Sequence, residues 1–183
     1  MPTLIRATQL AGLCLALAHL ALLAPASAQT APSRPLEQAF ASSLAELPQQ
    51  PLQVTGSIYV PVYSSVSISQ GRVRADFSVT LSIHNASQDK PLVLQKIAYF
   101  DTTGNLVESY LQKPIALKPF ATVEVYIGQA DVRGGTGANF IVDWGADGQI
   151  AEPVIEALML GGIGNGHYAF ISQGRPIRLV APR

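Results

Sequence analysis

The sequence predicts an all-β protein, an immunoglobulin-like antiparallel β-sandwich without a disulfide. From Leu52 onward, apolar and polar side chains alternate with period two, and turn residues recur at intervals of about ten residues. No alternation of strands with helices follows, which argues against a parallel α/β fold. The single cysteine, Cys14, precedes this region, so packing alone must stabilise the sandwich.

The first 28 residues have the pattern of a cleaved secretion signal. Arg6 supplies the positive start, residues 10–23 form an uncharged apolar run, and Ala26–Ala28 give the small-residue cleavage pattern that leaves Gln29 first. An uncleaved anchor needs roughly 20 apolar residues, more than this run provides. We therefore expect export to the periplasm, with no membrane span after cleavage.

The cysteine and the net charge indicate which attachments and partners are not expected for the mature chain. Leu13 is larger than the residue a lipoprotein peptidase prefers before cysteine, so Cys14 is expected to leave with the signal. Removing residues 1–28 takes away Arg6 alone and leaves 11 basic and 12 acidic residues, a formal charge of −1. This balance gives no electrostatic reason to expect nucleic acid or an anionic membrane as a partner.

Residues 29–51 are expected to be a proline-rich tether, followed by a single domain over residues 52–183. Gln, Ser and Ala dominate this segment, and proline interrupts it at Pro32, Pro35, Pro48 and Pro51. The alternative is a short amphipathic helix over residues 35–47, with Leu36, Phe40 and Leu44 on one side.

The clearest strand covers residues 72–84. Its apolar positions, Phe77, Val79, Leu81 and Ile83, alternate with Ser78, Thr80, Ser82 and His84. This pattern indicates one buried and one polar face. Residues 85–91 then supply turn chemistry. Earlier in the chain, Pro61 within residues 58–63 predicts an edge strand or a bulge.

A second group of strands follows the turn. Residues 92–100 are apolar enough for a strand covered on both sides, and residues 101–105 form a tight connection into a hairpin with residues 106–111. Further strands are predicted at 122–127, 138–144, 154–160 and 168–172. Residues 154–160 also suit a helical stripe, but Pro153 and Gly161 leave too few residues for an ordinary helix.

Several of these stretches resemble a family of exported bacterial proteins known as domain of unknown function 3124. They are Tyr59–Tyr63, Thr80–Asn85, Tyr99–Val107, Gly134–Phe140 and Ser172–Arg175. The similarity extends over about residues 58–177. The resemblance implies the β fold and export, and it implies no activity.

The loop at residues 131–139 is the candidate ligand site, through Asp131, Arg133, Gly135 and Asn139. Its glycines permit positive φ and close approach of backbone amides to a ligand, and Arg133 would pair with a carboxylate or phosphate. The loop lacks the Lys-Ser/Thr ending of a phosphate-binding loop. The alternative is a plain strand connection in which Asp131 or Asn139 holds backbone amides.

The remaining polar residues form no catalytic or metal motif. Asp143, Asp147, Glu152 and Glu156 lie in one stretch, but residues 143–148 depart from the calcium-loop pattern, and solvated turn carboxylates are the simpler interpretation. His84 and His167 lie far apart and outside any metal motif. No Gly-x-Ser-x-Gly elbow occurs. We expect no enzyme, no metal and no cofactor.

Among the aromatic residues, Trp144 shares an apolar face with Phe140 and Val142, whereas Tyr126 faces the other way and is the freer candidate for binding. The leading hypothesis is a non-catalytic periplasmic module that binds a protein or envelope component through its loops or an open sheet edge. The alternative is a small-molecule or metal-ion binding protein that uses residues 131–139. A hydrolase using Asp143 and Glu156 is the third.

Overall fold

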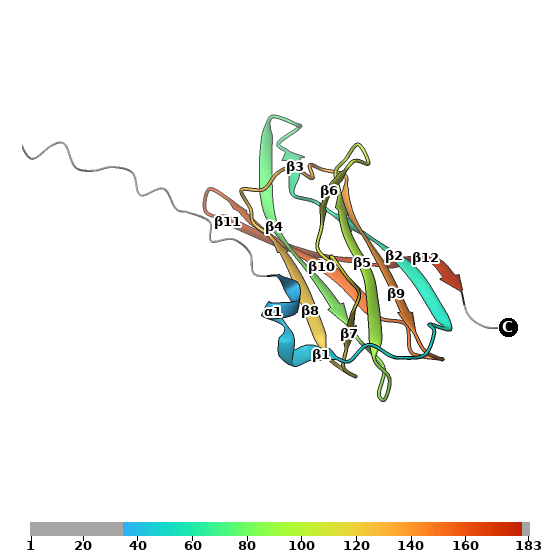
Figure 1. Ribbon diagram of the computed structural model, residues 1–183. Coiled ribbons are helices and arrows are strands. Elements are labelled where there is room, and N and C mark those ends of the chain that lie inside the picture. Colours follow the sequence, from blue (N-terminus) through green and yellow to red (C-terminus); the bar gives the residue numbers. More distant parts are fainter. Residues whose placement is uncertain (1–34, 181–183) are drawn as a thin grey trace, which may run out of the picture. The chain divides into compact units, whose positions relative to one another are not determined.

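The computed structural model describes residues 35–180, so the expected signal at residues 1–28 lies outside the described residues. Within them, two antiparallel sheets pack face to face (Figure 1). The seven-stranded sheet contains β1 (Leu44–Ala45), β2 (Val54–Val62), β5 (Leu92–Phe100), β6 (Leu106–Ser109), β7 (Ile115–Leu117), β9 (Ala138–Ala146) and β12 (Arg175–Val180). The five-stranded sheet contains β3 (Ser65–Ile68), β4 (Val73–His84), β8 (Thr122–Ile127), β10 (Val154–Ile163) and β11 (Gly166–Gln173).

The strand order confirms the predicted all-β sandwich. The larger sheet runs β1-β7-β5-β9-β2-β12, with β6 also paired to β5. The smaller sheet runs β11-β10-β4-β3, with β8 also paired to β4. Strands far apart in sequence are neighbours in both sheets, as in Greek-key sandwiches.

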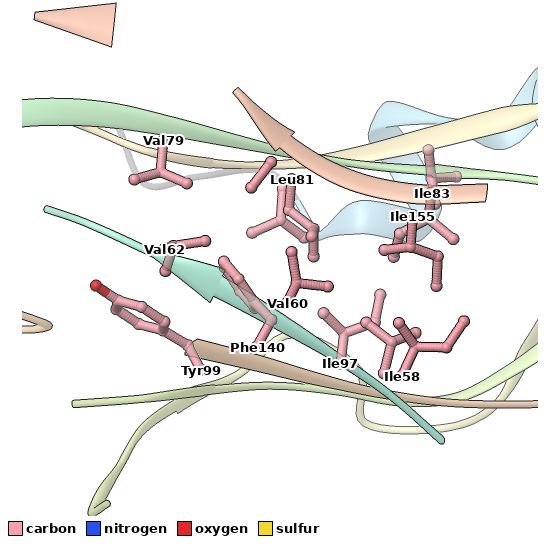
Figure 2. Close-up of a cluster of buried hydrophobic side chains, with 14 of the residues drawn as sticks. Ile58, Val60, Val62, Val79, Leu81, Ile83, Ile97, Tyr99, Phe140 and Ile155 are labelled. Carbon is pink, nitrogen blue, oxygen red and sulfur yellow. The ribbon is translucent and has the colours of Figure 1, made fainter. Parts of the chain in front are cut away.

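Alternating burial builds the core between the sheets. On β4, Phe77, Val79, Leu81 and Ile83 are buried, while the residues between them face outward. Figure 2 shows Val79 and Leu81 directed from β4 toward Val60 and Val62 of β2. Trp144, Tyr99 and Phe140 are the largest fully buried side chains. Burying each such apolar side chain contributes about 1.5–3 kcal/mol, which fixes the register of both sheets.

The strand pairing shows the structure of residues 154–160 and the position in its sheet of the strand that contains Pro61. Residues 154–160 belong to β10, which pairs with β4 on one side and β11 on the other. Pro61 lies on β2, which is an inner strand because β12 pairs with Thr55–Tyr59. Pro61 itself lies beyond the end of that pairing, so its missing N–H falls where β12 does not reach. The short strands β1, β3 and β7 and the terminal β12 were not predicted.

Residues 36–45 differ from the expected tether. They form α1 (Leu36–Ala39), the 3₁₀ turn η1 (Ala41–Ser43) and β1, and Leu44 of β1 pairs with Leu117. Leu36 is buried, while Phe40 and Leu44 are partly buried against the core. The physical reason is that Leu36, Phe40 and Leu44, the three apolar residues of the alternative helix, are removed from water by packing against the core; α1 contacts β8 there. The trio is therefore part of the domain.

Candidate functional site

The structure brings Asp131 and Arg133 of the candidate loop together. Arg133 Nε donates to Asp131 Oδ1 at 2.8 Å, and Nη2 donates to Asp131 Oδ2 at 2.7 Å and to Glu108 Oε2 at 3.1 Å. The hydrogen bonds from Arg133 hold the pKa of the Asp131 carboxyl below its ordinary value. Those to Asp131 and Glu108 raise the pKa of Arg133. The guanidinium is thus already shared between two carboxylates of the domain.

The glycines of the loop make close contacts with other loops of the protein. Gly134 O accepts hydrogen bonds from Thr102 N at 2.9 Å and Thr102 Oγ1 at 2.8 Å. Gly137 N donates to the same Oγ1 at 2.9 Å. Gly135, at φ +72°, offers its carbonyl to Ser64 N at 3.1 Å. Thr102 and Ser64 therefore hold the loop in place, as expected for a strand connection.

Tyr99 lies beneath the hydrogen bonds that Thr102 and Ser64 make with this loop. Its ring is fully buried against Phe140, with ring centroids 5.0 Å apart, and its hydroxyl is 3.4 Å from Ser64 Oγ. Burial raises the pKa of the Tyr99 phenol. In the turn that follows, hydrogen bonds from Thr103 and Asn105 lower the pKa of Asp101. The stretches 99–107 and 134–140 thus form one structural unit.

The fourth candidate residue, Asn139, lies in β9 between Pro61 and Phe100 of the neighbouring strands. It makes no side-chain hydrogen bond to Asp131 or Arg133 among the described contacts. Of the four predicted site residues, Asp131 and Arg133 pair directly, Gly135 contacts Ser64, and Asn139 stays in the sheet.

The acidic stretch does not converge. Asp143 lies on β9 in the seven-stranded sheet, where it accepts a hydrogen bond from Ser57, which in turn accepts one from Arg178. Glu156 lies on β10 in the other sheet, opposite Gln173 and Ser82. Within residues 35–180, no group of three or more His, Cys, Asp and Glu side chains is placed to hold a metal ion.

The C-terminal strands form a feature that sequence reasoning missed. β11 pairs with β10 in the five-stranded sheet, and β12 pairs with β2 in the seven-stranded sheet. Gly174 between them is where the chain changes sheets, and its N–H donates to Ile155 O at 2.8 Å. We call residues 166–180 the C-terminal ribbon. It is the edge strand of both sheets at once.

The ribbon exposes apolar side chains along its length. They are Tyr168, Ile171, Ile177, Leu179 and Val180. Phe170 anchors the ribbon, because its ring contacts Phe77 at 5.2 Å and Tyr63 at 5.8 Å between centroids. The sequence predicts a strand at residues 168–172, within β11, but β12 and its pairing with β2 were not predicted.

The outer face of the five-stranded sheet leads directly to this edge. Tyr126, Thr80, Leu158 and Ile171 lie side by side on β8, β4, β10 and β11. Tyr126, the aromatic residue singled out from sequence, is exposed. Beside Gly174, an open hollow of about 540 Å³ is bordered by Glu156 and Arg175.

Comparisons with known proteins agree with the sequence resemblance. A family model described as "Protein of unknown function (DUF3124)" matches residues 55–177. One solved structure, titled "Crystal Structure of Thermotoga maritima 1070", is 9% identical, and the match covers 66% of this chain and 92% of that chain with a TM-score of 0.39. No curated protein matches in sequence. Among the described helices, none is long and apolar enough to cross a membrane.

Proposed function

The chain belongs to the DUF3124 family, whose description names no activity, and on this premise we propose that it is a non-catalytic periplasmic binding module. Its ligand is an extended polypeptide segment that pairs with the free edge of the C-terminal ribbon. The observation that carries the proposal is this edge, which spans both sheets and exposes five large apolar side chains.

The free edge has the chemistry of strand addition. The outer backbone N–H and C=O groups of an edge strand are unpaired, and proteins usually protect them with charges, prolines or bulges. β11 carries no charged residue and no proline over its full length. β12, in contrast, has Arg175, Pro176, Arg178 and a register shift. The β11 half is therefore the receptive part.

The opposite edge of the five-stranded sheet, at β8, differs from the free edge at β11. There α1 lies against β8 (Figure 1). Leu36 of α1 is buried in the core. A strand added at β11 would instead find a firm platform, since Phe170 anchors that strand. Its outward side chains would extend the row that ends at Ile171. This row provides selection by side chain in addition to backbone pairing.

The distribution of polar groups supports a non-catalytic role. Asp143 and Glu156, the pair considered for hydrolysis, lie on different sheets. His84 is held by Ser82 at 2.9 Å and Thr122 at 2.8 Å. The periplasmic part of the proposal rests on the signal pattern at residues 1–28.

Site-specific photo-crosslinking in bacteria tests the proposal. A photoreactive amino acid is placed at Ile171, and in a control chain at Leu106, an equally exposed apolar residue (both 58%) on β6. We expect a polypeptide adduct from position 171, lost when Ala169→Lys is added, and none from position 106. Equal adducts at both positions, or none at 171, would overturn the ribbon site. Unprocessed precursor in the cytosol would overturn the periplasmic assignment.

A further inference from the structure

We propose that the segment bound by the ribbon is the same ribbon of a second copy of this chain, so that the two copies form a closed symmetric dimer. The proposal rests on the proposed function, because it identifies the partner of the same edge. A two-fold axis at Gly174 would run β11 of each copy antiparallel to β12 of the other.

The exposed apolar residues are arranged symmetrically about Gly174. Ile171 lies three residues before it and Ile177 three residues after, and they are 58% and 60% exposed. Tyr168 and Val180, six residues before and after, are 51% and 52% exposed. In an antiparallel pair centred on Gly174, residues up to the irregularity after Pro176 face those equally distant on the other side, so Ile171 of one copy would lie opposite Ile177 of the other. Apolar side chains would therefore face apolar side chains in both halves.

Charge is complementary in the same register. Gln173 pairs with Glu156 on β10, and the two-fold axis would place Arg175 of the second copy opposite Gln173. Neighbouring strands lie about 4.8 Å apart, so two long side chains span the two strand spacings between Arg175 and Glu156. Neither Glu156 nor Arg175 forms an ion pair with another described residue, and both border the open hollow beside Gly174. The dimer would thus contain two equivalent Arg–Glu pairs.

The geometry also closes the assembly. Each ribbon belongs to both sheets of its own copy, so pairing about Gly174 covers the free edge of both halves in both copies. No ribbon edge then remains for a third copy, and growth stops at two. Pro176 has no N–H to donate and the strand is irregular between Pro176 and Arg178, so one rung of the ladder is lost. The apolar contacts must outweigh this gap.

Sedimentation equilibrium of the purified mature chain tests the stoichiometry. We expect a dimer, and a dissociation constant raised about tenfold or more by Ile171→Lys or Ile177→Lys, since each replaces an exposed isoleucine that the dimer would bury in both halves of its interface. Leu106→Lys is the matched control and should stay dimeric. Arg175→Glu and Glu156→Arg should each weaken the dimer, and the double variant should recover it. Buried Trp144 reports by its fluorescence whether every variant is folded.

Disulfide trapping tests the register, because the mature chain has no other thiol. Chains with Ile171→Cys and chains with Ile177→Cys should form a mixed disulfide dimer on oxidation, whereas Ile171→Cys alone or Leu106→Cys alone should not. A monomer at all concentrations would overturn the dimer while leaving the proposed function intact if the adduct at position 171 persists with another protein. A dimer insensitive to the ribbon variants would overturn the inferred interface. Loss of both the dimer and the adduct would overturn both proposals.

Discussion

The hydroxyl of Tyr99 lies where a side chain at Gly134 would begin: a Cβ atom at Gly134 would be 1.8 Å from that oxygen. The two residues come from different family stretches, 99–107 and 134–140. The Gly134 carbonyl is at the same time held by Thr102. Glycine is therefore required at this position by the space left above the tyrosine ring, and the glycine-rich loop is part of the scaffold.

Gly134→Ala should lower the free energy of unfolding by about 1–3 kcal/mol, because neither the Tyr99 ring nor the locked loop can move without strain. Urea denaturation followed by Trp144 fluorescence measures this. Gly128→Ala is the matched control, since the nearest atom to its added Cβ is 3.9 Å away. Equal stabilities for the two variants would contradict the scaffold role of the loop.

Gly174→Ala should loosen the C-terminal ribbon. The new Cβ would lie 2.7 Å from the Ile155 carbonyl oxygen and 2.6 Å from Ile58 Cγ2, so the crossing between sheets must shift. Hydrogen exchange should become faster at the amides of residues 166–180 while those of β4 and β9 stay protected. Unchanged exchange in the ribbon would show that the crossing tolerates a side chain.

Asp131 should make a small acid-dependent contribution to stability. Its folded pKa is lowered by Arg133, so the contribution is present above the ordinary value of about 3.9 and is lost as pH falls through the folded pKa. Exposed ion pairs contribute about 0.2–1 kcal/mol, which sets the expected size. Stability measured against pH below 5 should fall less steeply in Asp131→Asn. An identical acid slope in both proteins would contradict this.

Tyr99 and Tyr110 should limit stability at alkaline pH. Burial raises the pKa of both phenols above the ordinary value of about 10. The folded state therefore retains protons that the unfolded chain releases. The contribution of the two phenols to the free energy of unfolding is fully present below pH 10 and is lost as pH rises further. Absorbance titration of the native protein should show a late tyrosinate phase that shrinks in Tyr110→Phe. Ionisation of all tyrosines in one phase near pH 10 would contradict it.

Period-two burial is a local property, and for that reason the sequence predicted most of the strands. Phe77 to Ile83 on β4 and Val123 to Ile127 on β8 both alternate between core and solvent as expected. Trp144 was placed in the core through its shared face with Phe140 and Val142, and it is buried there. The family did not follow from this alternation: it was recognised by resemblance of particular stretches, and the family model matches residues 55–177.

The loop at residues 131–139 shows where local reasoning ends. Its glycines suggested a ligand cradle, but Thr102 and Ser64, which occupy its backbone groups, lie far away in sequence. Likewise, the acidic stretch is continuous along the chain, yet Asp143 and Glu156 belong to different sheets. Spacing in sequence does not say which sheet a strand joins.

By itself, then, the sequence determined the all-β class and the alternating core faces, since both depend on neighbouring residues, and its separate stretches carried the resemblance to the family. Only the tertiary structure decided that Leu36 and Leu44 pack on the domain, and that β11 and β12 meet at Gly174 as one edge shared by both sheets. These features depend on where strands that are distant in sequence leave apolar surface exposed or backbone N–H and C=O groups unpaired. Such places exist only once the whole chain has packed.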